Sequence, residues 1–111
     1  SKRIQLQKNV ALQILLRLKD MRETMQASPF VQCHSIVGSS LLFVADQHGP
    51  DAGVFLIDFA KTFPVPEGTK INHRSPWVPG NNEDGIFLGI SNMISCWEKV
   101  LELLSINLKL C

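Results

Sequence analysis

The chain has 111 residues and a formal net charge of +1, with 45% hydrophobic and 19% charged residues. This composition predicts a globular protein with a single core, and it excludes a disordered chain and a strongly basic nucleic-acid-binding domain. No apolar run reaches the length of a membrane span, so we expect no transmembrane segment. No secretory signal pattern opens the chain, and because Ser1 stands where a methionine is expected, we expect a piece or a processed product of a longer protein.

The cysteines and histidines show no disulfide or metal-binding pattern. Cys33, Cys96 and Cys111 are odd in number and lack CxxC spacing, and the three histidines lack the spacing of metal ligands. We therefore expect free or buried thiols in a reducing compartment, the cytoplasm or the nucleus.

Residues 4–27 show the periodicity of an amphipathic helix. The apolar positions at helical spacing are Ala11, Leu15, Leu18, Met21 and Met25. Four further apolar residues widen this stripe, so we expect burial over much of the helix circumference: Val10, Leu12, Ile14 and Leu16. Residues 1–27 also hold six basic and two acidic residues. Such a helix either has a solvated polar face or binds phosphates, acidic lipid or calmodulin.

Two apolar segments, residues 37–45 and 54–62, flank a stretch of turn-forming residues and predict an antiparallel β-hairpin. Before them, Ser28 and Pro29 end the first helix and begin a short helical turn through Cys33. A hairpin symmetric about its loop places Leu41 opposite Asp58, and a slip of one residue places Ser40 there instead. In either register the serine pair 39–40 lies beside Asp58.

Asp58 is the unusual residue of the second strand, because it follows a run of large apolar side chains. An ionised carboxylate is costly to bury unless a cation, a metal or several donors meet it. Asp58 therefore lies either just past the strand end in water or beside a cationic partner.

Residues 62–85 predict a long irregular connection, rich in proline and glycine, that Trp77 anchors to the rest of the protein. Residues 81–84 offer N-cap candidates for a last helix. Its apolar positions are Phe87, Ile90, Ile94, Trp97, Leu101 and Leu104. We expect this face to be core, and we expect the tail, residues 105–111, to fray.

The chain lacks the GxGxxG, Walker A, HExxH and GxSxG patterns, which argues against several enzyme classes. A strand that ends in Asp-Phe, as at Asp58, can instead present an aspartate to a magnesium ion. Six segments occur in an order and at spacings that support this interpretation: Gly38–Phe43 (GSSLLF), Leu56–Thr62 (LIDFAKT), Pro66–Gly68 (PEG), His73–Trp77 (HRSPW), Gly80–Gly85 (GNNEDG) and Leu88–Gly89 (LG). Together they resemble the C-terminal part of the inositol polyphosphate kinase family, from about Leu18 to about Leu104. Lys61, the PEG segment and the HRSPW segment make the chain most similar to inositol 1,4,5-trisphosphate 3-kinases.

The resemblance implies roles for three residues. Asp58 would ligate Mg²⁺, Ser40 would support the metal or its water, and Lys61 would neutralise phosphate or hold Asp58 in place, although a surface ion pair is an equal alternative. The His73–Trp77 and Asn81–Gly85 segments would cover and brace the site rather than react. Asn82 and Ser91 stand where relatives often carry arginine and aspartate.

Several parts of the family pattern are missing from this sequence. The Pro-x-x-x-Asp-x-Lys-x-Gly motif, the ATP-binding N-terminal lobe and most of the inositol-phosphate-binding segment are not found in it. Calcium–calmodulin control, as in 3-kinase relatives, would reside upstream.

We therefore expect an α+β fold with a long helix, a hairpin, a Pro/Gly-rich loop and a C-terminal helix, forming one partial domain over residues 1–111. The intact parent would transfer phosphate from ATP, with Mg²⁺, to an inositol polyphosphate, and this chain alone would be inactive. The alternatives are a non-catalytic truncated isoform that acts by binding, and an interaction module unrelated to the family.

Overall fold

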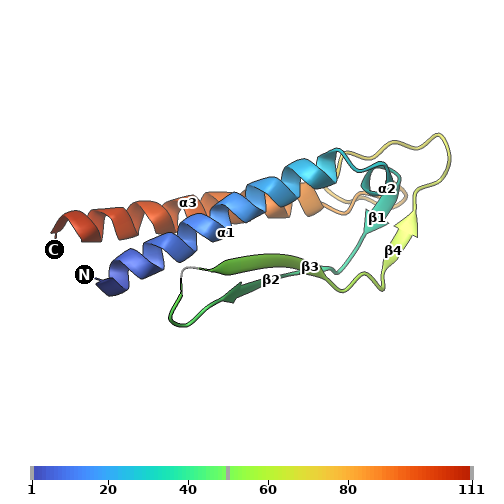
Figure 1. Cartoon of the computed structure of the whole chain (residues 1–111). Helices are drawn as coiled ribbons and strands as arrows, with labels where there is room; N and C mark the ends of the chain where they lie inside the picture. Colours follow the sequence, from blue (N-terminus) through green and yellow to red (C-terminus); the bar gives the residue numbers. More distant parts are fainter. Residues whose placement is uncertain (1, 50, 111) are drawn as a thin grey trace.

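The computed structural model describes residues 2–49 and 51–110, with side chains described as far as residue 106. Two long helices, α1 (Lys2–Gln26) and α3 (Ile86–Leu110), lie side by side, and a β-hairpin runs beneath them (Figure 1). The short helix α2 (Pro29–Gln32) and a second strand pair lie at the far end of the helices. The molecule measures 56 × 22 × 21 Å, which is elongated for a chain of this length. The predicted α+β fold is confirmed.

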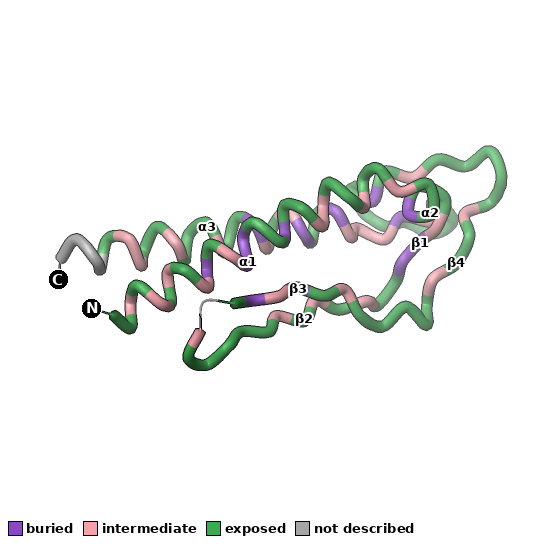
Figure 2. Tube along the Cα trace, viewed as in Figure 1, coloured by how far each residue is buried: buried purple, intermediate pink, exposed green. Residues whose placement is uncertain are grey.

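The core lies where α1, α3 and the hairpin meet (Figure 2). Helix α1 contributes Ala11, Ile14, Leu15 and Leu18 to it. Leu12 and Leu16 are exposed, so the prediction that α1 is buried over much of its circumference was wrong. The reason is geometric, since α3 and the hairpin pack on the same side of α1 and leave its other side uncovered.

Helix α3 follows the predicted apolar pattern. Phe87, Ile90 and Ile94 are buried, and three further members of the pattern are half-buried, namely Trp97, Leu101 and Leu104. Asp84, one of the predicted N-cap candidates, accepts a hydrogen bond from the Ile86 N–H through its Oδ1 at 3.0 Å. The expectation that the tail frays was wrong for residues 105–110, which are helical, whereas Cys111 lies outside the described residues. Leucine and lysine in this segment are good helix formers, which fits a helix that needs no stop signal there.

The hairpin consists of two strand pairs rather than two continuous strands. β1 (His34–Ile36) pairs with β4 (Thr62–Pro64), and β2 (Ser40–Ala45) pairs with β3 (Ala52–Ile57), both antiparallel. Strand β3 ends at Ile57, so Asp58 lies just past the strand end, as one of the two sequence interpretations expected, whereas the second strand pair was not predicted. The predicted helical turn before the hairpin is confirmed as α2, with the Ser28 Oγ accepting the Val31 N–H at 3.3 Å.

The observed register pairs Ser40 with Ile57, so both registers considered from the sequence were wrong. Strand β3 begins at Ala52, inside the stretch read as a turn, and the Asp46 N–H donates to the Asp51 carbonyl at 2.9 Å to close the loop. Because the loop is shorter than expected, each residue of β2 pairs with a residue that lies earlier in the chain than the expected partner. Asp58 consequently follows the last paired residue instead of lying within the ladder.

The two faces of the β2–β3 pair have different environments. Val54 faces the helices and is buried, whereas Leu42, Val44, Phe55 and Ile57 lie on the outer face and are exposed. Because side chains alternate along a strand, this outer face is apolar along the length of the pair. An exposed apolar face of this kind usually marks an interaction surface.

Candidate functional site

The predicted site residues meet at the break between the two strand pairs. Between the pairs Ile36–Thr62 and Ser40–Ile57, one arm has three residues, 37–39, and the other has four, 58–61. The break therefore interrupts the ladder and divides the hairpin into two separate two-stranded sheets. The Val37 N–H donates to the Lys61 carbonyl at 3.0 Å, which keeps the two arms together across the break.

The backbone of the break is turned on both arms. Gly38 has φ 71° and Asp58 has φ 72°, so both residues adopt the left-handed conformation. This conformation is free for glycine, but for a residue with a Cβ it costs about 1–2 kcal/mol. Aspartate tolerates it better than most residues, and such strain clusters at functional sites. The left-handed turn ends β3 and directs the chain away from the ladder at Asp58.

The side chains of Asp58, Ser40 and Lys61 are all exposed at this break. Asp58 makes no hydrogen bond or ion pair with any residue that the structure describes, so the carboxylate lies just past the strand end in water. The surface ion pair considered for Lys61 is not formed within residues 2–49 and 51–110. The Lys61 side chain instead lies along the opposite arm. A Cβ atom placed on Gly38 would be 3.7 Å from the Lys61 Cδ.

The side chains at the break suit a magnesium ion that also binds phosphates. They suit a metal ion held by protein ligands alone less well. No cluster of three or more histidine, cysteine, aspartate or glutamate side chains occurs in the described part of the chain. Mg²⁺ keeps several waters and is commonly bound through one or two carboxylates together with substrate phosphates. A single free carboxylate at a fixed strand end meets that requirement.

A cavity of about 450 Å³ lies between the hairpin and the start of α3, and Gly38 and Ser39 of the break are part of its lining. Its lining is mainly apolar and includes Leu41, Phe43, Ile90 and Met93. Asp84, the acidic residue of the lining, is already fully paired, so no free charge points into the cavity.

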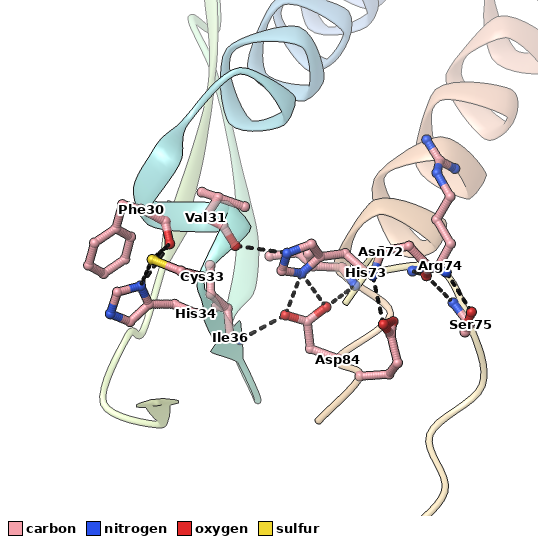
Figure 3. Close-up of polar contacts among 12 residues, drawn as sticks. Phe30, Val31, Cys33, His34, Ile36, Asn72, His73, Arg74, Ser75 and Asp84 are labelled. Atoms are coloured by element: carbon pink, nitrogen blue, oxygen red, sulfur yellow. Dashed lines mark hydrogen bonds and ion pairs between the residues drawn. The ribbon is translucent and has the colours of Figure 1, made fainter. Parts of the chain in front are cut away.

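The pairing of Asp84 involves His73, a buried residue of the HRSPW segment (Figure 3). The His73 Nδ1 lies 2.8 Å from the Asp84 Oδ2, and the Nε2 donates to the Val31 carbonyl at 2.8 Å. The same carboxylate accepts the Ile36 N–H at 2.8 Å. The His73 carbonyl accepts the N–H groups of Phe87 and Leu88, the first turn of α3. This arrangement ties the long loop to α2, β1 and α3.

Trp77, which we expected to anchor the long loop, is 67% exposed. The anchoring residues are His73 and Glu83, whose Oε1 accepts the Asn72 N–H at 2.7 Å. The free thiols predicted from the cysteine pattern are confirmed for Cys33 and Cys96, both of which are exposed.

Comparisons with known proteins point to one family. The family model described as inositol polyphosphate kinase matches residues 1–98. The chain belongs to the inositol polyphosphate kinase family. The match begins earlier and ends earlier than the resemblance read from the motifs, which ran from about Leu18 to about Leu104.

Similar relatives include inositol-trisphosphate 3-kinases. The chain is 46% identical over 93 residues to the inositol-trisphosphate 3-kinase homolog of Caenorhabditis elegans, which covers 84% of this chain and 18% of the relative. It is 46% identical over 99 residues to inositol-trisphosphate 3-kinase A of Homo sapiens, and the match covers 89% of this chain and 21% of that relative. It is 51% identical over 78 residues to inositol-trisphosphate 3-kinase C of Mus musculus, and the match covers 70% of this chain and 11% of that relative. The predicted similarity to the 3-kinase branch is confirmed, and the chain spans about a fifth of the length of the first two relatives.

Proposed function

We propose that this chain is the C-terminal part of an ATP-dependent inositol phosphate kinase and that it supplies the Mg²⁺-binding aspartate, Asp58. The family membership and the names of the relatives support phosphoryl transfer to an inositol polyphosphate, of the inositol 1,4,5-trisphosphate 3-kinase type. The observation that carries the assignment is the free, exposed carboxylate of Asp58 in a left-handed conformation at the break in the hairpin.

The residues at the break would act by position and charge. Mg²⁺ bound there would neutralise charge that builds up on the phosphates during transfer. Asp58 would hold the metal at a fixed point, because the preceding strand β3 is paired along its length. Ser40, which pairs with Ile57, would offer a hydroxyl to a metal-bound water from the neighbouring strand. Lys61 would place a positive charge on the same side of the break, facing phosphate oxygens.

The exposed surface supports the proposal that further protein covers this chain. The accessible surface is 7386 Å², whereas a compact protein of its mass exposes about 6,100 Å². The radius of gyration is 16.9 Å, against about 13 Å for a compact chain of this length. The apolar outer face of the hairpin, with Leu42 and Phe55, is the surface on which the rest of the catalytic domain would pack.

The cell compartment and partners follow from this proposal. The substrates are ATP and an inositol polyphosphate, and the compartment is the cytoplasm or the nucleus. Calmodulin would act only through segments that precede these residues in the longer protein. None of the helices in the described part of the chain combines the length and apolar composition that a bilayer span requires.

Radiolabel transfer from ATP to inositol 1,4,5-trisphosphate tests the proposal. We expect no transfer by the 111-residue chain, and we expect transfer by a longer protein that carries the upstream Asp-x-Lys-x-Gly motif and ends in this sequence. Robust transfer by the 111 residues alone would overturn the partial-domain proposal. An inactive longer protein that folds would favour the non-catalytic alternative.

A further inference from the structure

Two arginine side chains from distant parts of the sequence meet on one serine of α3. The Arg22 Nη1, on α1, lies 3.4 Å from the Ser91 Oγ, and the Arg74 Nη1, on the long loop, lies 3.3 Å from the same oxygen. Figure 3 shows the Arg74 side chain extending beside α3, away from His73 and Asp84. The guanidinium of Arg74 also lies over the Phe87 ring, 5.9 Å from its centroid, which restricts its position.

The two positive charges have no acidic partner within the described residues. The ion pairs found there are His73–Asp84 and Lys99–Glu102, and neither involves an arginine. Ser91 is neutral and accepts one hydrogen bond from each arginine, which leaves most of the five N–H donors of each guanidinium unused. Two like charges held on one oxygen repel each other, so a negative group placed between them would be stabilised.

Ser91 itself supplies a third donor. Its oxygen accepts from both arginines, while its hydroxyl hydrogen has no acceptor among the residues that the structure describes. An anion that contacts this hydroxyl and both guanidiniums would receive hydrogen bonds from three side chains on three elements. A phosphate monoester suits such a site, because its several oxygens carry nearly two charges and match the planar guanidinium fork.

We propose that Arg22, Arg74 and Ser91 bind a phosphomonoester group at a site separate from the break that holds Asp58. None of the three residues lines the cavity between the hairpin and α3 or lies within residues 37–40 or 58–61. The site therefore does not depend on the kinase function proposed above. The phosphate can belong to a soluble polyphosphorylated metabolite or to a phosphoinositide headgroup, which present the same chemical group.

Ligand titration of the 111-residue chain tests this site. The probes are inorganic phosphate and inositol hexakisphosphate. Their binding is measured from the thermal unfolding midpoint and by calorimetry. We expect both probes to bind and to raise the midpoint. Removing one charge-assisted partner by Arg22→Gln or Arg74→Gln should weaken binding roughly tenfold to a hundredfold. Arg17→Gln is the matched control, because Arg17 is exposed on α1 and makes none of these contacts, and it should bind like the unmodified chain.

Ser91→Asp distinguishes a specific site from general attraction to basic residues. The introduced carboxylate would pair with both arginines, raise the unfolding midpoint without ligand and compete with the phosphate. Loss of binding in this variant supports the proposal. Binding by Ser91→Asp, Arg22→Gln and Arg74→Gln equal to that of the unmodified chain would overturn it, as would no binding by the unmodified chain.

Vesicles distinguish the two sources of the phosphate. Sedimentation with vesicles that contain phosphatidylinositol bisphosphate, lost in the arginine variants, supports a lipid headgroup. Binding of the soluble probes without vesicle sedimentation supports a soluble metabolite.

Discussion

Replacing Asp84 by alanine should strongly destabilise the protein. The Asp84 side chain is fully buried and accepts hydrogen bonds from the N–H groups of Ile36 and Ile86, at 2.8 and 3.0 Å, as well as facing the His73 Nδ1. Removal leaves the two N–H groups and the His73 Nδ1 without their partner in a region that water does not reach. The carboxylate also connects β1, the long loop and the start of α3, so its loss weakens three elements together.

The size of the effect follows from the partners that are lost. Each buried polar group left without its hydrogen-bond partner costs about 1–3 kcal/mol. Because such terms are not additive, we expect about 4 kcal/mol in total. Domains of this size have free energies of unfolding of about 5–15 kcal/mol, so the variant should be near the limit of folding.

Urea unfolding, followed by tryptophan fluorescence and circular dichroism, measures the effect. Asp84→Asn keeps one acceptor oxygen and the shape of the side chain, so it should cost about half as much, about 2 kcal/mol, and should remain folded. Asp20→Ala is the matched control, because Asp20 is exposed on α1, and it should change the free energy of unfolding by less than about 0.5 kcal/mol. A cost for Asp84→Ala as small as that of Asp20→Ala would refute the reasoning.

Three further predictions follow from packing, backbone conformation and exposed surface. Leu18→Ala should cost about 2–5 kcal/mol because Leu18 is fully buried, whereas Leu16→Ala, on the exposed side of the same helix, should cost less than about 1 kcal/mol in the same urea titrations. Asp58→Gly should raise the free energy of unfolding by about 1 kcal/mol, since glycine adopts φ 72° without strain, and no gain in stability would contradict a strained backbone at this position. We expect the unmodified chain to self-associate in sedimentation measurements through the exposed apolar face of the hairpin, and Phe55→Lys on this face should reduce the association, whereas a monomeric unmodified chain or unchanged association would contradict this.

The helices could be predicted from the sequence because their signals are local. The apolar spacing in α3, with Phe87, Ile90 and Ile94 on one face, needs no knowledge of the partner that it packs against. The width of the buried stripe on α1 could not be predicted, since the exposure of Leu12 and Leu16 depends on where the hairpin and α3 lie. The break in the hairpin was missed for a similar reason, because the second arm continues with residues that suit a strand, such as Phe59 and Thr62.

The candidate site, like the fold, could be predicted from the sequence only in part. Motif resemblance pointed to Asp58, Ser40 and Lys61, and the structure brings the three residues to one break between strand pairs. The buried contact of His73 with Asp84 joins residues that are eleven positions apart in a loop without periodicity, so no local pattern could predict it. The meeting of Arg22 and Arg74 on Ser91 depends on the packing of α1 and the loop against α3 and is equally invisible in the sequence.

The most direct test of the central claim is the effect of Asp58→Asn on phosphoryl transfer by the longer protein proposed above, which carries the upstream Asp-x-Lys-x-Gly motif and ends in this sequence. Asparagine preserves the shape of the side chain and tolerates the left-handed backbone, but it removes the charge that would hold Mg²⁺. Asp51→Asn is the control, because Asp51 is an exposed aspartate at the other end of the same hairpin. The account predicts that Asp58→Asn abolishes transfer from ATP to inositol 1,4,5-trisphosphate while the unfolding midpoint stays unchanged and Asp51→Asn remains active. Transfer by Asp58→Asn at the rate of the unmodified longer protein would contradict it.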